Sequence, residues 1–236
     1  RLLRRPLLPA EIHVVNDFLL TLTDPVVAMV YDLPASLFDG VPVPLGWHPG
    51  FGECWFDRPG KGLISRPTTA LRLGRKLAGN RETLRLVSPY LILTRSLRRH
   101  LKRQRQAGVG IEILTNSLAS TDVPLVYGAY RRHRPWLERQ GIVLAELAGE
   151  AHSLHAKLIL MGEEEALLGS FNLDPRSLML NTELMLHLRC TALCAELRHW
   201  LCGWQQAAAH PVVAPPSTLR RLLARLSDWL PLRPWL

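Results

Sequence analysis

From residue 66 onward, short apolar runs alternate with longer segments of helical periodicity, and this alternation most constrains the fold. The clearest strand pattern is Leu84–Val87, and the clearest helix opens at Thr94 and ends at Gly108. Strands that alternate with helices favour an α/β fold with a mixed sheet. Further strands are expected at 53–56, 109–114, 142–147, 153–161, 166–171 and 181–188, and further helices at 66–78, 120–140, 191–209 and 217–230.

The same pattern divides the chain into three parts. Residues 1–65 are irregular and rich in Pro and Gly, so we expect an incomplete N-terminal segment, the remnant of a first half. Residues 66–210 hold the regular alternation and form the expected domain. Residues 211–236 are a Pro-rich linker followed by a basic amphipathic tail.

Composition excludes several classes of protein. Of 236 residues, 47% are apolar and 21% charged, which is typical of a globular protein. The sequence has no run of 18 apolar residues, the length that would span a bilayer. Its four Cys contain no CxxC pair, so they predict neither a disulfide framework nor a metal site. The formal charge of +9 predicts an anionic partner, and it does not choose among nucleic acid, an acidic membrane surface and a phosphate-bearing substrate.

The strongest chemical signal is His155-Ala156-Lys157 followed by Gly169-Ser170-Phe171-Asn172. Alternate residues of a strand share a face, so His155 and Lys157 would point the same way, as would Ser170 and Asn172 on the next strand. Glu183 follows on a third strand, where a carboxylate behind an imidazole would fix its tautomer. The competing interpretation is a hairpin with polar residues on its solvent face.

A loop after another expected strand supplies further candidates. Residues 115–124 follow the strand 109–114, and α/β folds gather ligand sites at such positions. We therefore expect Thr115 and Asn116 to bind substrate. Helix capping explains Thr121 and Asp122 equally well.

The paired motifs resemble the HKD motif of the phospholipase D superfamily. The surrounding ranges 87–90, 114–124 and 169–183 resemble the bacterial cardiolipin synthases of type C. This resemblance implies a phospholipase D-like mixed sheet flanked by helices, and a two-step phosphodiester reaction through a phosphohistidine without metal or cofactor. It implies catalytic roles for His155, Lys157, Asn172 and Glu183, and Ser170 would contact substrate. His155 is then the nucleophile or, as in the C-terminal motif of two-motif relatives, the general acid.

Two features depart from the family pattern. The motif Asp is replaced by Gly162, with Glu163 beside it, which affects the turn more than the chemistry. The chain also carries a single HxK, because neither His13 nor His48 is followed by Lys two residues later. The chain would then be the C-terminal half of a longer or split protein, a homodimer with facing His155 residues, or an inactive copy. We favour the first of these explanations.

Three functions follow from these features. The first is a cardiolipin synthase-like phosphatidyltransferase that uses a phosphatidylglycerol-like lipid and an acceptor alcohol, peripheral on the cytoplasmic side of an anionic membrane. The second is a homodimeric nuclease or phosphodiesterase, and the third is an inactive lipid-binding module. The basic segment 95–105 is either an anion-binding patch or a solvated helix face, and the tail 217–236 either lies in a membrane interface or packs against the domain.

Overall fold

The computed structural model describes residues 52–58, 60–62, 65–147, 153–209 and 217–229. Expectations for residues 1–51, 211–216 and 230–236 lie outside this part of the chain. The strands are β1 (Gly52–Phe56), β2 (Leu84–Val87), β3 (Ile111–Asn116), β4 (Val143–Leu147), β5 (Leu158–Met161), β6 (Glu165–Gly169) and β7 (Leu184–Arg189). The helices are α3 (Thr68–Gly79), α4 (Arg95–Gln106), α5 (Pro124–Arg131), α6 (Arg134–Arg139), α7 (Pro175–Met179), α8 (Thr191–Ala209) and α9 (Thr218–Trp229).

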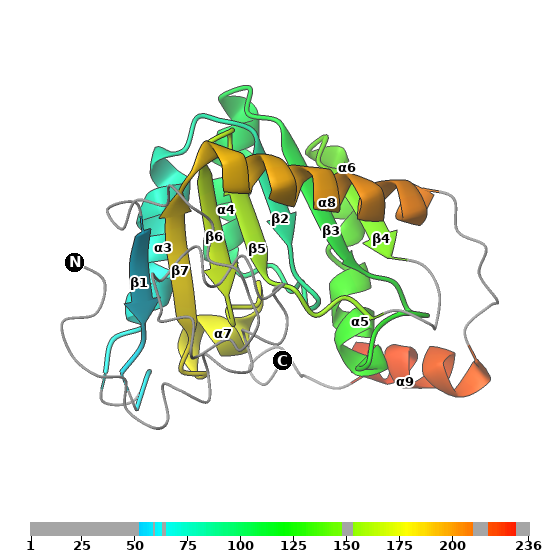
Figure 1. Ribbon diagram of the computed structural model, residues 1–236. Helices are drawn as coiled ribbons and strands as arrows, with labels where there is room; N and C mark the ends of the chain where they lie inside the picture. Colours follow the sequence, from blue (N-terminus) through cyan, green and yellow to red (C-terminus); the bar gives the residue numbers. More distant parts are fainter. Residues whose placement is uncertain (1–51, 59, 63–64, 148–152, 210–216, 230–236) are drawn as a thin grey trace, which may run out of the picture.

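The described strands form one seven-stranded mixed sheet in the order β1-β7-β6-β5-β2-β3-β4 (Figure 1). β2, β3 and β4 are parallel to one another, whereas β5, β6, β7 and β1 pair antiparallel with their neighbours. The expected α/β class with a mixed sheet flanked by helices is confirmed.

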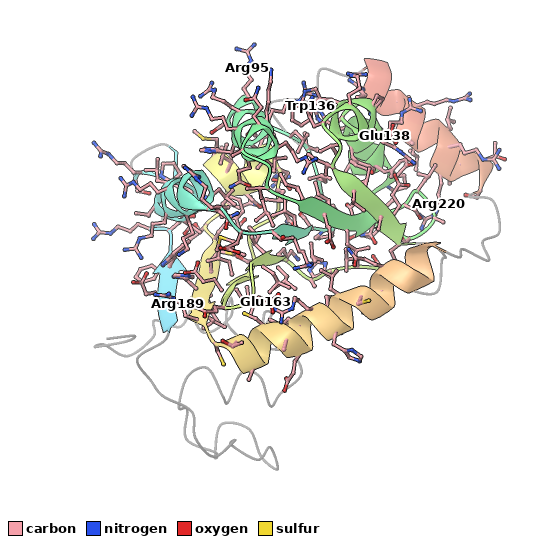
Figure 2. All side chains as sticks on the ribbon, turned by 90° about the horizontal axis from the view of Figure 1, so that it is seen from above. Arg95, Trp136, Glu138, Glu163, Arg189 and Arg220 are labelled. Carbon is pink, nitrogen blue, oxygen red and sulfur yellow. The ribbon has the colours of Figure 1, made fainter. Side chains whose placement is uncertain are left out.

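Helices cover both faces of the sheet. On one face, Leu73 and Leu77 of α3, Leu101 of α4 and Leu137 of α6 join one buried cluster with the strands. On the other face, the long helix α8 lies along the sheet, and Leu193 is part of a second buried cluster. Figure 2, seen from above, shows α8 on one side and α3, α4, α5 and α6 on the other. Within the described residues, no helix is both long and apolar enough to cross a bilayer.

The helix predicted after Leu93 is confirmed. The Thr94 hydroxyl accepts a hydrogen bond from the Leu97 backbone N–H and so caps the first turn of α4. At the other end, Gly108 has φ +82°, a left-handed conformation that glycine adopts without a Cβ penalty. The tail helix is also present as α9, which packs against α5.

The single helix predicted over 120–140 is wrong. The chain forms α5 and α6, separated by a turn at Arg132 and His133. Pro135 lies in the first turn of α6, and proline has no backbone N–H to continue a preceding helix. Pro124 likewise occupies the first turn of α5, so the capping expected at Thr121 and Asp122 does not occur and Val123 precedes the helix instead.

β1 confirms the strand expected at 53–56, within a segment that was otherwise expected to be irregular. Its five residues pair antiparallel with β7, from Gly52 opposite Leu188 to Phe56 opposite Leu184. Trp55 is buried and joins the cluster under α3. The folded unit therefore begins before residue 66 in the described part of the chain.

Candidate active site

The predicted site residues gather at one edge of the sheet, which we call the site edge. Strand directions place the carboxyl ends of β1, β2, β3, β4 and β6 there, together with the amino ends of β5 and β7. α7 follows β6 at this edge (Figure 1). Asp57, Lys157, Ser170 and Glu183 each lie directly beyond a strand end at this edge. Residues more than 100 positions apart in sequence are thus brought to one edge.

The His155 segment does not begin as a strand, contrary to the prediction for 153–161. β5 starts only at Leu158. Before it, the Asn116 side chain takes up the backbone hydrogen-bonding groups of Leu154 that a neighbouring strand would otherwise pair with. The Asn116 amide oxygen accepts from the Leu154 N–H and its amide nitrogen donates to the Leu154 carbonyl, both at 2.9 Å. His155 is exposed at the surface, next to this anchored residue.

The side chains of Asn116 and Thr115 were expected to bind substrate, but both are buried. Asn116 is 2% exposed and Thr115 is 1% exposed at the end of β3. Asn116 also accepts a hydrogen bond from the Ser120 hydroxyl at 3.1 Å. Its amide is committed to holding the chain before His155, which makes it a positioning residue.

Lys157 connects the two motifs. Its ammonium group donates to the His155 carbonyl oxygen at 2.7 Å, and its own carbonyl accepts from the Gly169 N–H at 3.2 Å. Burial lowers the pKa of Lys157 from 10.5 to about 8, although the negative charges of Glu183, Asp122 and Asp174 act to raise it. Lys157 is thus a partly desolvated cation whose protonated form is favoured by the charges of three carboxyl groups.

Gly169 allows β6 and β7 to approach closely at the second motif. A Cβ at this position would lie 2.1 Å from the Leu184 carbonyl oxygen and 2.8 Å from the Met185 Cα, so a larger residue would force the strands apart. The strand predicted over 166–171 accordingly ends at Gly169, and the Asn172 N–H donates to the Ser177 hydroxyl at 3.1 Å as the chain turns into α7.

The Asn172 side chain is the uncommitted polar group of the motif. Its amide oxygen is buried and has no hydrogen-bond partner in the described part of the chain. A buried polar atom without a partner is costly in a protein, and the Asn172 amide oxygen is such an atom, able to accept a hydrogen bond. Asn172 thus differs from Asn116, whose amide oxygen and amide nitrogen both have hydrogen-bond partners.

Glu183 precedes β7 and is 4% exposed. The strand predicted over 181–188 begins only at Leu184. The Ser170 hydroxyl donates to a Glu183 carboxylate oxygen and accepts from the Leu184 N–H. Burial raises the pKa of Glu183, while hydrogen bonds from Ser170 and Ser177 oppose that rise. Ser170 therefore orients Glu183, in addition to the substrate contact expected for it.

A buried ion pair that the sequence did not suggest holds Glu183 in place. Asp57 and Lys61 are 2.6 Å apart with fully buried side chains. Asp57 accepts hydrogen bonds from the Thr69 N–H at 2.9 Å and the Glu183 N–H at 3.2 Å. Lys61 donates to the Ser177 carbonyl oxygen at 2.5 Å. The one sequence signal was an Asp and a Lys four residues apart, and two of their partners, Ser177 and Glu183, lie more than 100 residues away.

Three loops meet at the site edge near Lys157. The Tyr90 hydroxyl donates to an Asp122 carboxylate oxygen at 2.7 Å, and both burial and this bond raise the pKa of Tyr90. Ser88 is fully buried, and its hydroxyl accepts from the Leu173 N–H at 3.0 Å. These bonds join the loops after β2, β3 and β6.

Gly162 lies in the β5–β6 turn, at the opposite edge of the sheet from His155. Its φ is +63°, and an added Cβ would lie 2.9 Å from the Glu82 Cβ. A side chain at this position cannot reach the site edge, so the replacement of the motif Asp affects the turn.

Comparison with known proteins identifies the family to which the chain belongs. Residues 73–203 match a family model described as the PLD-like domain of cardiolipin synthase. This chain therefore belongs to the phospholipase D-like family of cardiolipin synthase domains. Cardiolipin synthase C of Escherichia coli strain K12 is 36% identical over 147 residues, covering 54% of this chain and 31% of that protein.

An uncharacterized protein of Helicobacter pylori strain 26695 is 34% identical over 151 residues, covering 59% of this chain and 30% of that protein. This chain thus matches about a third of the length of these relatives.

Solved structures share the fold at low sequence identity. The phosphatidylserine synthase of Haemophilus influenzae superposes with a TM-score of 0.58 at 16% identity, covering 78% of this chain and 48% of that protein. The phospholipase D family member Nuc of Salmonella typhimurium gives a TM-score of 0.51 at 17% identity, covering 66% of this chain and 95% of that protein. These likenesses establish the phospholipase D-like fold.

Proposed function

We propose that the site edge catalyses phosphatidyl transfer from a phosphatidylglycerol-like lipid to an acceptor alcohol, as the similarity to cardiolipin synthase C suggests. The observation that carries this proposal is the joining of the two motifs. The Lys157 ammonium group lies at the His155 backbone, and the Lys157 carbonyl bonds to Gly169 of the second motif. The ammonium group of Lys157 and the amide NH2 group of Asn172 would together hold the nonbridging oxygens of one phosphate, because both groups donate hydrogen bonds.

The reaction would proceed in two displacements. First, a histidine nitrogen attacks phosphorus, a P–N bond forms, and the P–O bond to the leaving alcohol breaks. The leaving oxygen takes a proton from a second histidine. Next, the acceptor hydroxyl attacks the phosphohistidine, its proton passes to the second histidine, and the P–N bond breaks. Atoms and charges balance over the cycle without an external oxidant or reductant.

His155 would be this second histidine, and the nucleophilic histidine would come from outside the motif described above. We propose His155 as the acid and base, with the nucleophile supplied by a second HKD half in the same longer chain or by a second copy of this chain. Glu183, fixed by Ser170, supplies negative charge that favours the protonated forms of the neighbouring cations. A peripheral position on the cytoplasmic face of an anionic membrane fits a lipid substrate.

The substrate is tested directly by offering the full gene product both phosphatidylglycerol vesicles and DNA. The expected result is a new phospholipid in the vesicle fraction, identified by mass spectrometry, with DNA left intact. Cleavage of DNA without lipid conversion would instead support a homodimeric nuclease. Conversion of neither substrate would leave a non-catalytic lipid-binding module and overturn the proposal.

A further inference from the structure

α9 has two different sides. Ala224 is buried against the domain, and Arg220 donates to the carbonyl oxygens of Leu118 and Thr121 at 3.1 and 2.7 Å. These bonds fasten the helix to the loop between β3 and α5, and Figure 2 labels Arg220 on α9. One side of the helix therefore packs against the domain, which was one of the two alternatives expected for the tail.

The other side exposes leucines. Leu219, Leu222 and Leu226 are 65%, 57% and 42% exposed. Their spacing of three and four residues places them on one face of the helix. Large apolar side chains that are exposed together, and not singly, mark a surface that meets a partner or a membrane. We call these three residues the leucine stripe.

The charges around the stripe point to an anionic partner. Between Thr218 and Leu226 the helix carries three arginines and no acidic residue. Arg221 and Arg225 are exposed, whereas Arg220 is used for packing. A helix with an apolar face and flanking cations is the pattern that binds at the surface of an anionic bilayer.

The leucine stripe also lies near the site edge. Thr121, which Arg220 contacts, adjoins Asp122, the partner of Tyr90 at the site edge. α7 lies at the same edge (Figure 1), and Met179 and Leu180 at its end are exposed side chains. Two separate elements thus present apolar side chains at the edge that carries His155.

We propose that the leucine stripe, with Arg221 and Arg225, is a docking surface for an anionic lipid bilayer and holds the site edge against it. The stripe enters the interfacial layer while the arginines contact lipid phosphates. The choice of lipid as partner rests on the proposed function, but the surface is defined by α9 itself. A nucleic acid would engage the arginines and leave the stripe in water, so the leucines favour lipid.

The test measures sedimentation of the protein with vesicles of phosphatidylglycerol or of phosphatidylcholine. We expect binding to phosphatidylglycerol, and a loss of about tenfold or more in the double variant Leu219→Ser/Leu222→Ser. Arg225→Gln should weaken binding to phosphatidylglycerol by about fivefold and leave binding to phosphatidylcholine unchanged.

Leu71→Ser is the matched control, because Leu71 is an exposed leucine, 46% accessible, on the cationic helix α3. It should bind vesicles as the wild type does. Equal binding by the wild type and the α9 double variant would overturn the proposal, as would equal losses in Leu71→Ser. The proposal would also be overturned if a second copy of the chain covered the leucine stripe. In that case the protein would be a dimer, and the double variant would dissociate it without any loss of vesicle binding.

His155→Ala separates this inference from the proposed function. That variant should bind vesicles normally, because His155 is not part of α9, whatever happens to lipid turnover. If the wild type binds vesicles but converts no lipid, the docking surface stands and the proposed activity fails. If lipid is converted by the α9 double variant with unchanged vesicle binding, the activity stands and the docking surface fails.

Discussion

Lys157 is the residue whose chemistry depends most on its surroundings. Its ammonium group is charged below its pKa of about 8 and loses that charge above it. Because a neutral amine cannot balance a phosphate charge, turnover should fall as pH rises through about 8. Lys157→Arg keeps the charge and should remove this fall. Glu183→Gln should move the fall to lower pH, since Glu183 acts to raise the pKa of Lys157.

The lowered pKa of Lys157 also makes the stability of the fold depend on pH. Between about 8 and 10.5 the unfolded chain holds a proton on Lys157 that the folded chain has lost, so the free energy of unfolding rises with pH over this window. pH–rate profiles and denaturant unfolding measure the two effects, with Lys76→Arg as the control. An alkaline limb that Lys157→Arg leaves in place would show that another group titrates.

At the scale of single residues, the motif residues were readable from sequence but their contacts were not. His155, Lys157 and Asn172 were found because they lie a few positions apart in two short motifs. Asn116 was expected to bind substrate, yet it anchors Leu154, 38 residues away. Periodicity cannot show that a side chain replaces a strand partner, which is why β5 begins later than predicted.

Among the structural elements, the loop after β1 depends on the buried pair of Asp57 and Lys61. Lys61→Met leaves the Asp57 carboxylate buried without its counter-charge and should lower the free energy of unfolding by about 3–5 kcal/mol. Lys76→Met is the matched control, because Lys76 and Glu165 are also 2.6 Å apart but partly exposed. Its cost should stay below about 1 kcal/mol.

Chemical denaturation measures both variants, and the combined Asp57→Asn/Lys61→Met variant should recover part of the loss by removing the stranded charge. Similar costs for Lys61→Met and Lys76→Met would refute the structural role of the buried pair. The sequence offered little warning of this pair, since the groups it joins, Ser177 and Glu183, are 116 and 126 residues distant.

The β5–β6 turn allows a second test at the level of an element. Gly162→Asp restores the family residue but places a side chain at φ +63° and close to Glu82, so it should destabilise the fold by about 1–3 kcal/mol. Gly108→Asp isolates the backbone effect, because Gly108 has φ +82° with nothing within 4 Å of an added Cβ. Its cost should be the smaller of the two.

Neither glycine variant should change turnover, because Gly162 lies at the edge opposite the site. A rise in turnover with Gly162→Asp at unchanged stability would contradict this placement. The β5–β6 turn itself was predictable from sequence. The break between α5 and α6 was also predictable, because Pro135 cannot continue a preceding helix. A single helix was nevertheless expected over 120–140.

Over the whole molecule, positive charge gathers on α3 and α4. The two helices carry three and six Lys or Arg residues and no acidic residue. Part of this charge is structural, since Arg98 lies over the Trp136 ring at 5.1 Å and Arg105 donates to the Gln140 carbonyl at 3.0 Å. Arg95 and its exposed neighbours extend from the surface (Figure 2), which leaves a general attraction for anions.

The central claim is that the site edge transfers a phosphodiester through His155, and the rate of phosphatidylglycerol turnover by His155→Ala tests it most directly. The full gene product carrying His155→Ala should turn over at least about a hundredfold to ten-thousandfold more slowly than the wild type, with an unchanged free energy of unfolding. His199→Ala, a change at an exposed histidine on α8, should keep the wild-type rate. Substantial turnover by His155→Ala would contradict the assignment of the site.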